Sequence, residues 1–144
     1  MRFMMFMYPQ IDEADWNPSA EDIAEMSRYN LELRDAGMLL SLDGLRPPSE
    51  GASVVFEGKG EARVLDGPFA EAKEVVGGYW LIQARSEEEV IEWAKRCPGE
   101  HCRIEVRRIF ELEDFPPEVQ EEIPYDKSLH LGVEDASAPE AGAS

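Results

Sequence analysis

Several residues and patterns that mark common enzyme classes are scarce or missing in this chain of 144 residues. Its two histidines, His101 and His130, do not have the spacing of metal ligands, and residues 1–100 contain none. Its two cysteines, Cys97 and Cys102, do not form a CxxC pair, so no zinc site is predicted. No GxGxxG or P-loop sequence is present. We therefore expect no metal and no cofactor.

Long hydrophobic runs are also absent. No apolar run approaches the roughly 20 residues that are needed to span a bilayer. Residues 1–8 are apolar apart from Arg2, but they are too short for the core of a signal peptide and no small-residue cleavage site follows them. We expect a cytoplasmic protein whose two thiols stay reduced, with a strained disulfide between Cys97 and Cys102 as the alternative.

Basic residues are few. The chain contains 14 Lys and Arg but 31 Asp and Glu, and its net charge is therefore −17. Nucleic acid and anionic membrane surfaces would repel such a chain, so neither is expected as a partner. Residues 111–144 hold ten acids and one base, and hence −9 of the −17. We predict one domain over 1–110 and a partly disordered acidic extension over 111–144. The extension either packs on a partner subunit or remains a solvated tail.

What the first 110 residues do contain is an alternation of strand and helix patterns. Short apolar or alternating runs predict strands at four places, which are 2–8, 38–45, 78–84 and 103–109. Ser19 is expected to cap a helix that Gly37 ends, and a capping box at 86–89 is expected to open a second helix. The inner stripe of the first helix is predicted to contain Ile23, Met26, Asn30 and Leu33. Residues 54–56 and 62–65 predict a hairpin.

This order predicts an α+β fold with a ferredoxin-like (βαββαβ-type) antiparallel sheet, an added hairpin and two helices on one face. The strands at 2–8 and 78–84 are apolar on both alternating sets of side chains. Two helices can cover only one face of the sheet, so the other face needs a partner. We expect a homodimer that forms sheet to sheet or edge to edge.

The most distinctive stretch is DGPFAEAKE at residues 66–74, followed by GGYW at 77–80. Glycine and proline after Asp66 restrict the backbone to a tight turn. Two interpretations stay open. Asp66 either bonds backbone N–H groups of a structural turn, or it points into a pocket as a catalytic acid–base group beside Lys73 and Glu74. Phe69, Tyr79 and Trp80 nearby would raise its pKa, and Lys73 would lower it.

Tyr8, Tyr79 and Arg107 are further candidates for ligand binding. Arg103, Glu105 and Arg107 share one face of the last strand. They form either a charge ladder or, through the fork of Arg107, a site for an anionic substrate. The two tyrosine hydroxyls could add donors to the same cleft, or both rings could belong to the core.

Four segments together resemble the DGPF branch of the YCII-related family: DGPFAEAKE, GGYW, SEEEVIEWAKRCP and IEVRR. The family consists of small bacterial α+β proteins, and the resemblance covers residues 1–110. It implies a homodimer and a functional role for Asp66, Lys73 and Glu74, which lie on the motif itself. Two positions depart from the family pattern, namely Ala72 in place of threonine and Arg108 in place of proline.

Other members of this family have a histidine in the N-terminal half that is thought to pair with an aspartate matching Asp66. Residues 1–100 of this chain contain no histidine, so this acid–base pair is missing. Whether the chain is an enzyme therefore stays open. One hypothesis is small-molecule binding in an Asp66-centred cleft near a dimer interface. The alternative is a non-catalytic regulatory module with an acidic tail, since family members are often linked with extracytoplasmic-function sigma factors.

Overall fold

The computed structural model describes residues 1–67 and 74–122. Contacts group the chain into two units, Met1–Arg108 and Ile109–Ser144, which are described separately here. Lys73 and the turn residues 68–72 lie outside the described residues. The predicted division of the chain at residue 110 stays a prediction.

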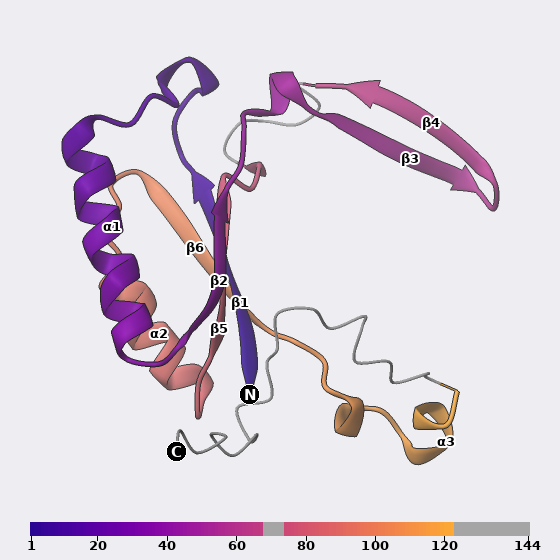
Figure 1. The fold of residues 1–144 in the computed structure, drawn as a ribbon. Helices are drawn as coiled ribbons and strands as arrows, with labels where there is room; N and C mark the ends of the chain where they lie inside the picture. Colours follow the sequence, from indigo (N-terminus) through magenta and orange to yellow (C-terminus); the bar gives the residue numbers. More distant parts are fainter. Residues whose placement is uncertain (68–73, 123–144) are drawn as a thin grey trace, which may run out of the picture. The chain divides into compact units, whose positions relative to one another are not determined.

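A four-stranded antiparallel sheet forms the centre of the first unit (Figure 1). Its strands are β1 (Arg2–Pro9), β2 (Leu39–Gly44), β5 (Gly78–Gln83) and β6 (Cys102–Arg108). They lie side by side in the order β2-β5-β1-β6, so β1 and β5 are central. The α+β class and the predicted order of elements are confirmed.

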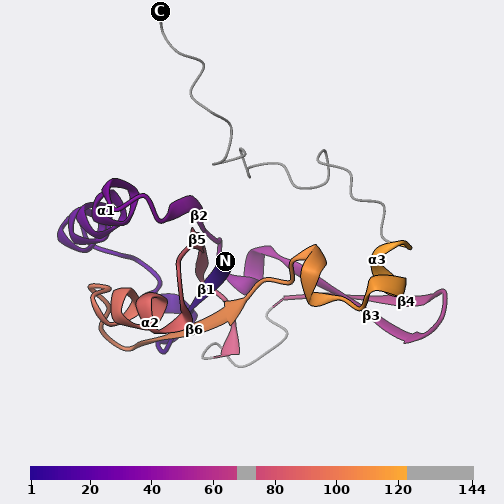
Figure 2. The same cartoon turned by 90° about the horizontal axis from the view of Figure 1, so that it is seen from below.

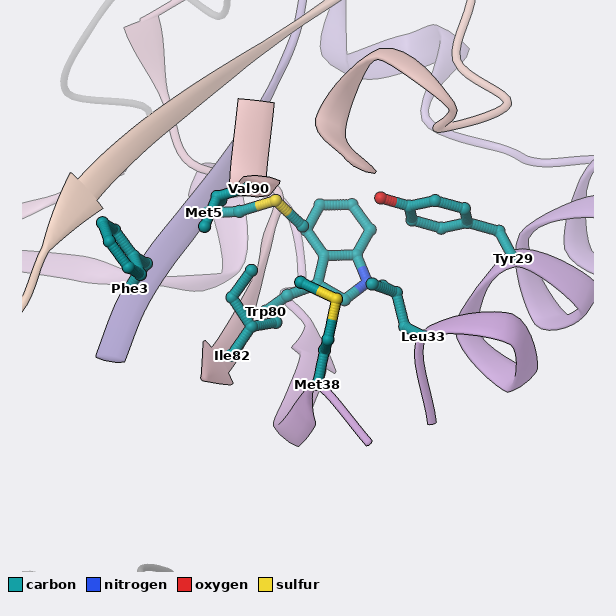
Figure 3. Packing of buried hydrophobic residues seen from close by; sticks show 8 residues of the cluster. All are labelled: Phe3, Met5, Tyr29, Leu33, Met38, Trp80, Ile82 and Val90. Atoms are coloured by element: carbon teal, nitrogen blue, oxygen red, sulfur yellow. The ribbon is translucent and has the colours of Figure 1, made fainter. Parts of the chain in front are cut away.

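Two helices pack on one face of this sheet, α1 (Ala20–Asp35) and α2 (Glu87–Lys95) (Figures 1 and 2). The core lies between the helices and the sheet (Figure 3). Its buried side chains come from both helices, from the two strands β1 and β5, and from the residue before β2: Phe3, Met5, Tyr29, Leu33, Met38, Trp80, Ile82 and Val90. Alternate residues of β1 and β5 point into this core, which leaves the intervening residues for the opposite face.

Helix α1 begins and ends as its sequence predicts. The Ser19 side chain accepts a hydrogen bond from the Asp22 backbone N–H at 3.1 Å, and Asp22 accepts one from the Ser19 N–H at 3.0 Å. These bonds form a capping box and lower the pKa of Asp22. At the other end, Gly37 has a φ of +73°, the left-handed conformation that commonly ends a helix.

Replacing Ser19 with alanine is expected to lower the free energy of unfolding by about 1 kcal/mol, because the first turn loses a cap for its N–H groups. Urea denaturation measures the change. Ser27→Ala is the matched control, since the Ser27 hydroxyl bonds only a carbonyl of the same helix, that of Ile23. Equal losses in the two variants would contradict the capping role.

The predicted inner stripe of α1 is partly wrong. Ile23 is 54% exposed, whereas Tyr29, absent from the predicted stripe, is buried. The Tyr29 ring meets Trp80 edge to face at 6.0 Å, and its hydroxyl donates to the Trp93 carbonyl at 2.8 Å. Tyrosine can be buried here because this bond satisfies its polar end.

The predicted capping box of α2 is only half formed. The Ser86 side chain accepts from the Glu89 N–H at 3.2 Å, as expected. The Glu89 carboxylate accepts instead from the N–H of Arg85 at 3.1 Å, one residue before the predicted partner.

The predicted hairpin is present as a separate two-stranded sheet, β3 (Ala52–Gly58) with β4 (Glu61–Asp66). Gly60 in its turn has a φ of +86°. The Gly67 N–H donates to the Gly51 carbonyl at 3.1 Å and closes the other end of the hairpin. The hairpin therefore does not extend the main sheet.

The remaining described elements are short. The first unit contains η1 (Glu13–Asp15) and η2 (Pro48–Glu50), and the second contains η4 (Leu112–Asp114) and α3 (Pro117–Gln120). Across residues 1–67 and 74–122, no helix has both the length and the apolar character that a membrane crossing requires.

Candidate functional site

The face of the main sheet opposite α1 and α2 gathers most of the predicted ligand residues. We call it the open face, and its members follow from the strand register and the alternation of side chains. They are Arg2, Met4, Phe6, Tyr8, Ser41, Asp43, Tyr79, Leu81, Gln83, Arg103, Glu105 and Arg107. Because α1 and α2 lie on the other side, neither helix covers these residues (Figure 1).

The open face has an apolar middle and polar edges. Phe6 of β1 lies opposite Tyr79 of β5 on one side and Glu105 of β6 on the other. Met4 lies opposite Leu81 and Arg107 in the same way. Phe6 and Met4 of β1 therefore form an apolar middle, and β2 and β6 add polar and charged groups at the two edges.

At the β2 edge, Tyr79 and Asp43 form a hydrogen-bonded pair. The Tyr79 hydroxyl donates to Oδ2 of Asp43 at 2.8 Å. This bond raises the pKa of Tyr79, and a hydrogen bond with Ser41 opposes the shift in part. The phenol thus stays protonated while it holds the carboxylate in place. Sequence analysis missed Asp43 as a site residue; its only signal was a charged side chain within a mainly apolar strand.

At the β6 edge, the three charged residues differ in their partners. The Arg103 guanidinium lies over the Tyr8 ring, 4.1 Å from the centroid, and its Nη1 is 3.2 Å from Oε2 of Glu105. Among the described residues, Arg107 forms no ion pair, and its side chain is exposed. The predicted ladder therefore exists between Arg103 and Glu105, and the Arg107 fork remains available.

Asp66 belongs to the separate β3–β4 hairpin and not to the main sheet that carries the open face. It is the last residue of β4, opposite Ala52 in the hairpin, and it is exposed. Glu74 is exposed as well. Tyr79 and Trp80 cannot both face the Asp66 carboxylate from one sheet face, because neighbouring strand residues point to opposite faces and Trp80 is buried in the core. That part of the predicted environment is wrong.

The structure also has an open groove of about 1260 Å³, which Asp66 does not line. Its lining includes Met7, Trp16, Trp80 and Cys97, and it also includes Asp43 and Tyr79, the hydrogen-bonded pair at the β2 edge. The indole N–H of Trp16 is buried there and has no hydrogen-bond partner within the described part of the chain. Because that N–H is shielded from solvent, it offers no contact point for a ligand in the groove.

Both cysteines line this groove as free thiols, as predicted. Burial, with a smaller effect of Cys102, raises the pKa of Cys97 from an ordinary value of 9.0 to about 12. Burial also raises the pKa of Cys102. Both thiols are therefore protonated and poorly nucleophilic at neutral pH.

The raised pKa of Cys97 predicts a loss of stability at alkaline pH. Below pH 9 the thiol is protonated in both the folded and the unfolded chain, so it has no effect. Between about pH 9 and about 12 the unfolded chain loses its proton first, and folding becomes less favourable as pH rises. Melting temperatures measured across this window should fall less steeply for Cys97→Ser than for the wild type. Parallel curves would contradict the assigned burial.

Within residues 1–67 and 74–122, no group of three or more His, Cys, Asp or Glu is placed to hold a metal ion. The polar groups of the open face instead suit an organic molecule, because they combine aromatic rings, hydroxyls and a guanidinium beside an apolar floor.

Comparison with known proteins agrees with this fold. The model of the YCII-related domain matches residues 1–113. An uncharacterised protein of Rhizobium meliloti (strain 1021) is 32% identical over 74 residues, which are 51% of this chain and 56% of that protein. The match thus spans only about half the length of this curated relative. With its motifs, its α+β sheet and a match over most of its length, the chain belongs to the YCII-related family.

Proposed function

We propose that the protein is a cytoplasmic homodimer that binds a small molecule on the open face. One observation carries this proposal: Tyr8, Tyr79 and Arg107 are far apart in the sequence, yet they lie on the same face of the main sheet. Each comes from a different strand. Apolar side chains lie between these three residues, and a large apolar patch on a soluble protein commonly marks an interaction site. This also supports a second copy of the chain that covers the open face.

The layout of the open face indicates the kind of ligand. Tyr79 on β5 lies level with Phe6 of β1, and Arg107 on β6 lies level with Met4, two residues further along β1. Two strand spacings across the sheet and two residues along it place their backbones about 12 Å apart. A small molecule with an apolar body can lie on Phe6 and Met4 across this distance. Its acceptor atoms would meet the Arg107 fork, which offers several N–H donors.

We also assign the chain to the DGPF branch, because DGPFAEAKE occupies residues 66–74. Asp66 remains our candidate for acid–base catalysis and Lys73 and Glu74 remain candidate ligand residues. No observation on the described residues favours the regulatory alternative, which stays a prediction.

A screen of metabolites by thermal shift tests the proposal. For a metabolite that raises the melting temperature, Arg107→Gln is expected to weaken binding about tenfold or more, because it removes a charged hydrogen-bond donor. Arg34→Gln is the matched control, since Arg34 is exposed on α1 and pairs with Asp35. Equal binding by both variants, or a wild-type chain that sediments as a monomer, would overturn the proposal.

A further inference from the structure

One face of the β3–β4 hairpin exposes three large apolar side chains in a row. Val54 is 53% exposed, Phe56 is 69% exposed and Val64 is 63% exposed. Val54 lies directly opposite Val64, and Phe56 lies opposite Ala62. Paired residues of an antiparallel ladder point to the same side, so these side chains form one continuous surface.

Such a surface requires a cover. An isolated two-stranded hairpin is marginally stable in water, and it gains stability when its apolar face packs against another element. The three side chains expose an area of the order of a few hundred Å², the size at which patches on soluble proteins are commonly functional.

The charges on this hairpin face and on the open face are complementary. Ala52 pairs with Asp66, so the Asp66 carboxylate belongs to the same hairpin face as Val64 and is its single charge. On the open face, Arg107 is a basic residue that forms no ion pair among the described residues, whereas Arg103 pairs with Glu105 and Asp43 accepts from the Tyr79 hydroxyl. Within the described part of the chain, the hairpin face therefore carries an acid, Asp66, and the open face carries a base, Arg107, neither of which has an ion-pair partner there.

We propose that the hairpin of one copy lies on the open face of a second copy and brings its Asp66 beside Arg107 there. The inference rests on the proposed function and completes it. The ligand site is then composite, with Tyr8, Tyr79 and Arg107 from one subunit and Asp66 from the other. The Asp66 carboxylate of one copy and the Arg107 guanidinium of the other then offer a bound molecule a hydrogen-bond acceptor beside a set of donors.

The occupant is a second copy for two reasons. A chain of net charge −17 repels other acidic surfaces, including its own copies, except where a surface is close to neutral. The open face is not acidic, because its two acids, Asp43 and Glu105, stand against three bases, Arg2, Arg103 and Arg107, and its formal charge is +1. In addition, the area that the hairpin patch alone could bury is smaller than the roughly 800 Å² per partner of a standard interface. In a dimer with two-fold symmetry the contact between hairpin and open face occurs twice, so the buried area doubles.

Charge reversal tests the contact in the full-length chain. Asp66→Arg and Arg107→Asp are each expected to raise the dimer dissociation constant by about tenfold or more, because each places like charges together at two symmetric positions. Mixing the two variants should restore the dimer, since both contacts of the mixed dimer regain opposite charges. Native mass spectrometry identifies the mixed species, and sedimentation gives the dissociation constants.

Asp35→Arg is the control for the change in net charge, because Asp35 is exposed at the end of α1. It should leave the dissociation constant within about twofold of the wild type. Circular dichroism checks that every variant is folded.

The outcomes separate this inference from the proposed function. Restoration by the double variant in one chain, but not by mixing, would show a contact within one chain and overturn the inference. A wild-type dimer that ignores both substitutions would overturn it too, while the dimeric ligand site would stand. A wild-type monomer would overturn both proposals.

Discussion

Replacing Trp80 with alanine is expected to lower the free energy of unfolding by about 3–5 kcal/mol. Trp80 is 5% exposed and lies in the middle of the core, between the sheet and α1 (Figure 3). Its ring meets Tyr29 edge to face at 6.0 Å, and its Nε1 donates to Oδ1 of Asn30 at 2.8 Å. The substitution removes a large apolar side chain and leaves the Asn30 oxygen without its donor, so cavity and polar costs add.

Chemical denaturation at one fixed protein concentration measures this loss. Leu31→Ala on α1 is the control, because it also shortens an apolar side chain but at a position that is 46% exposed. Its effect should stay within about 0.5 kcal/mol. Similar losses for both variants would mean that Trp80 does not organise the core.

Gly77→Ala is the second substitution for which we expect a large effect, a loss of about 1–3 kcal/mol. A Cβ atom at this position would lie 2.6 Å from Cγ and 2.8 Å from Cδ of Pro9. The proline ring cannot turn away, because it is part of the backbone at the end of β1. The Gly77 N–H also donates to the Met7 carbonyl at 2.7 Å, which holds the two segments together.

Gly44→Ala is the matched control for this substitution. Gly44 lies at the end of β2, and a Cβ atom there would meet no atom within 4 Å. Its substitution should change the free energy of unfolding by no more than about 0.5 kcal/mol. If the two alanine variants unfolded at the same denaturant concentration, close packing against Pro9 would not be the reason for glycine at position 77.

Local signals were sufficient to predict most of the fold. Ser19 and Gly37 mark the ends of α1 because a cap and a left-handed residue act within a few residues of themselves. The inner stripe of α1 was harder, since the burial of Tyr29 depends on Trp80 and on the Trp93 carbonyl, both distant in the sequence. Periodicity alone cannot supply such partners.

The site was less predictable, because its side-chain pairs also join residues that are distant in the sequence. The Asp43–Tyr79 pair depends on the register of β2 against β5, which the sequence does not specify. Trp80 was expected near Asp66, but strand alternation sends it into the core. In contrast, Arg107 was identified because three charged residues alternate along one strand and must share a face.

The hydrogen bond from the Leu45 N–H to the Gly77 carbonyl, at 2.9 Å, has a practical consequence. It brings together the points where the chain leaves β2 and where it enters β5. Among the described residues between them, Ser49 also donates to the Glu13 carboxylate, which lies outside the main sheet. A short linker could replace residues 46–76 and leave the four-stranded scaffold intact, and the same two points could accept a foreign loop in protein engineering.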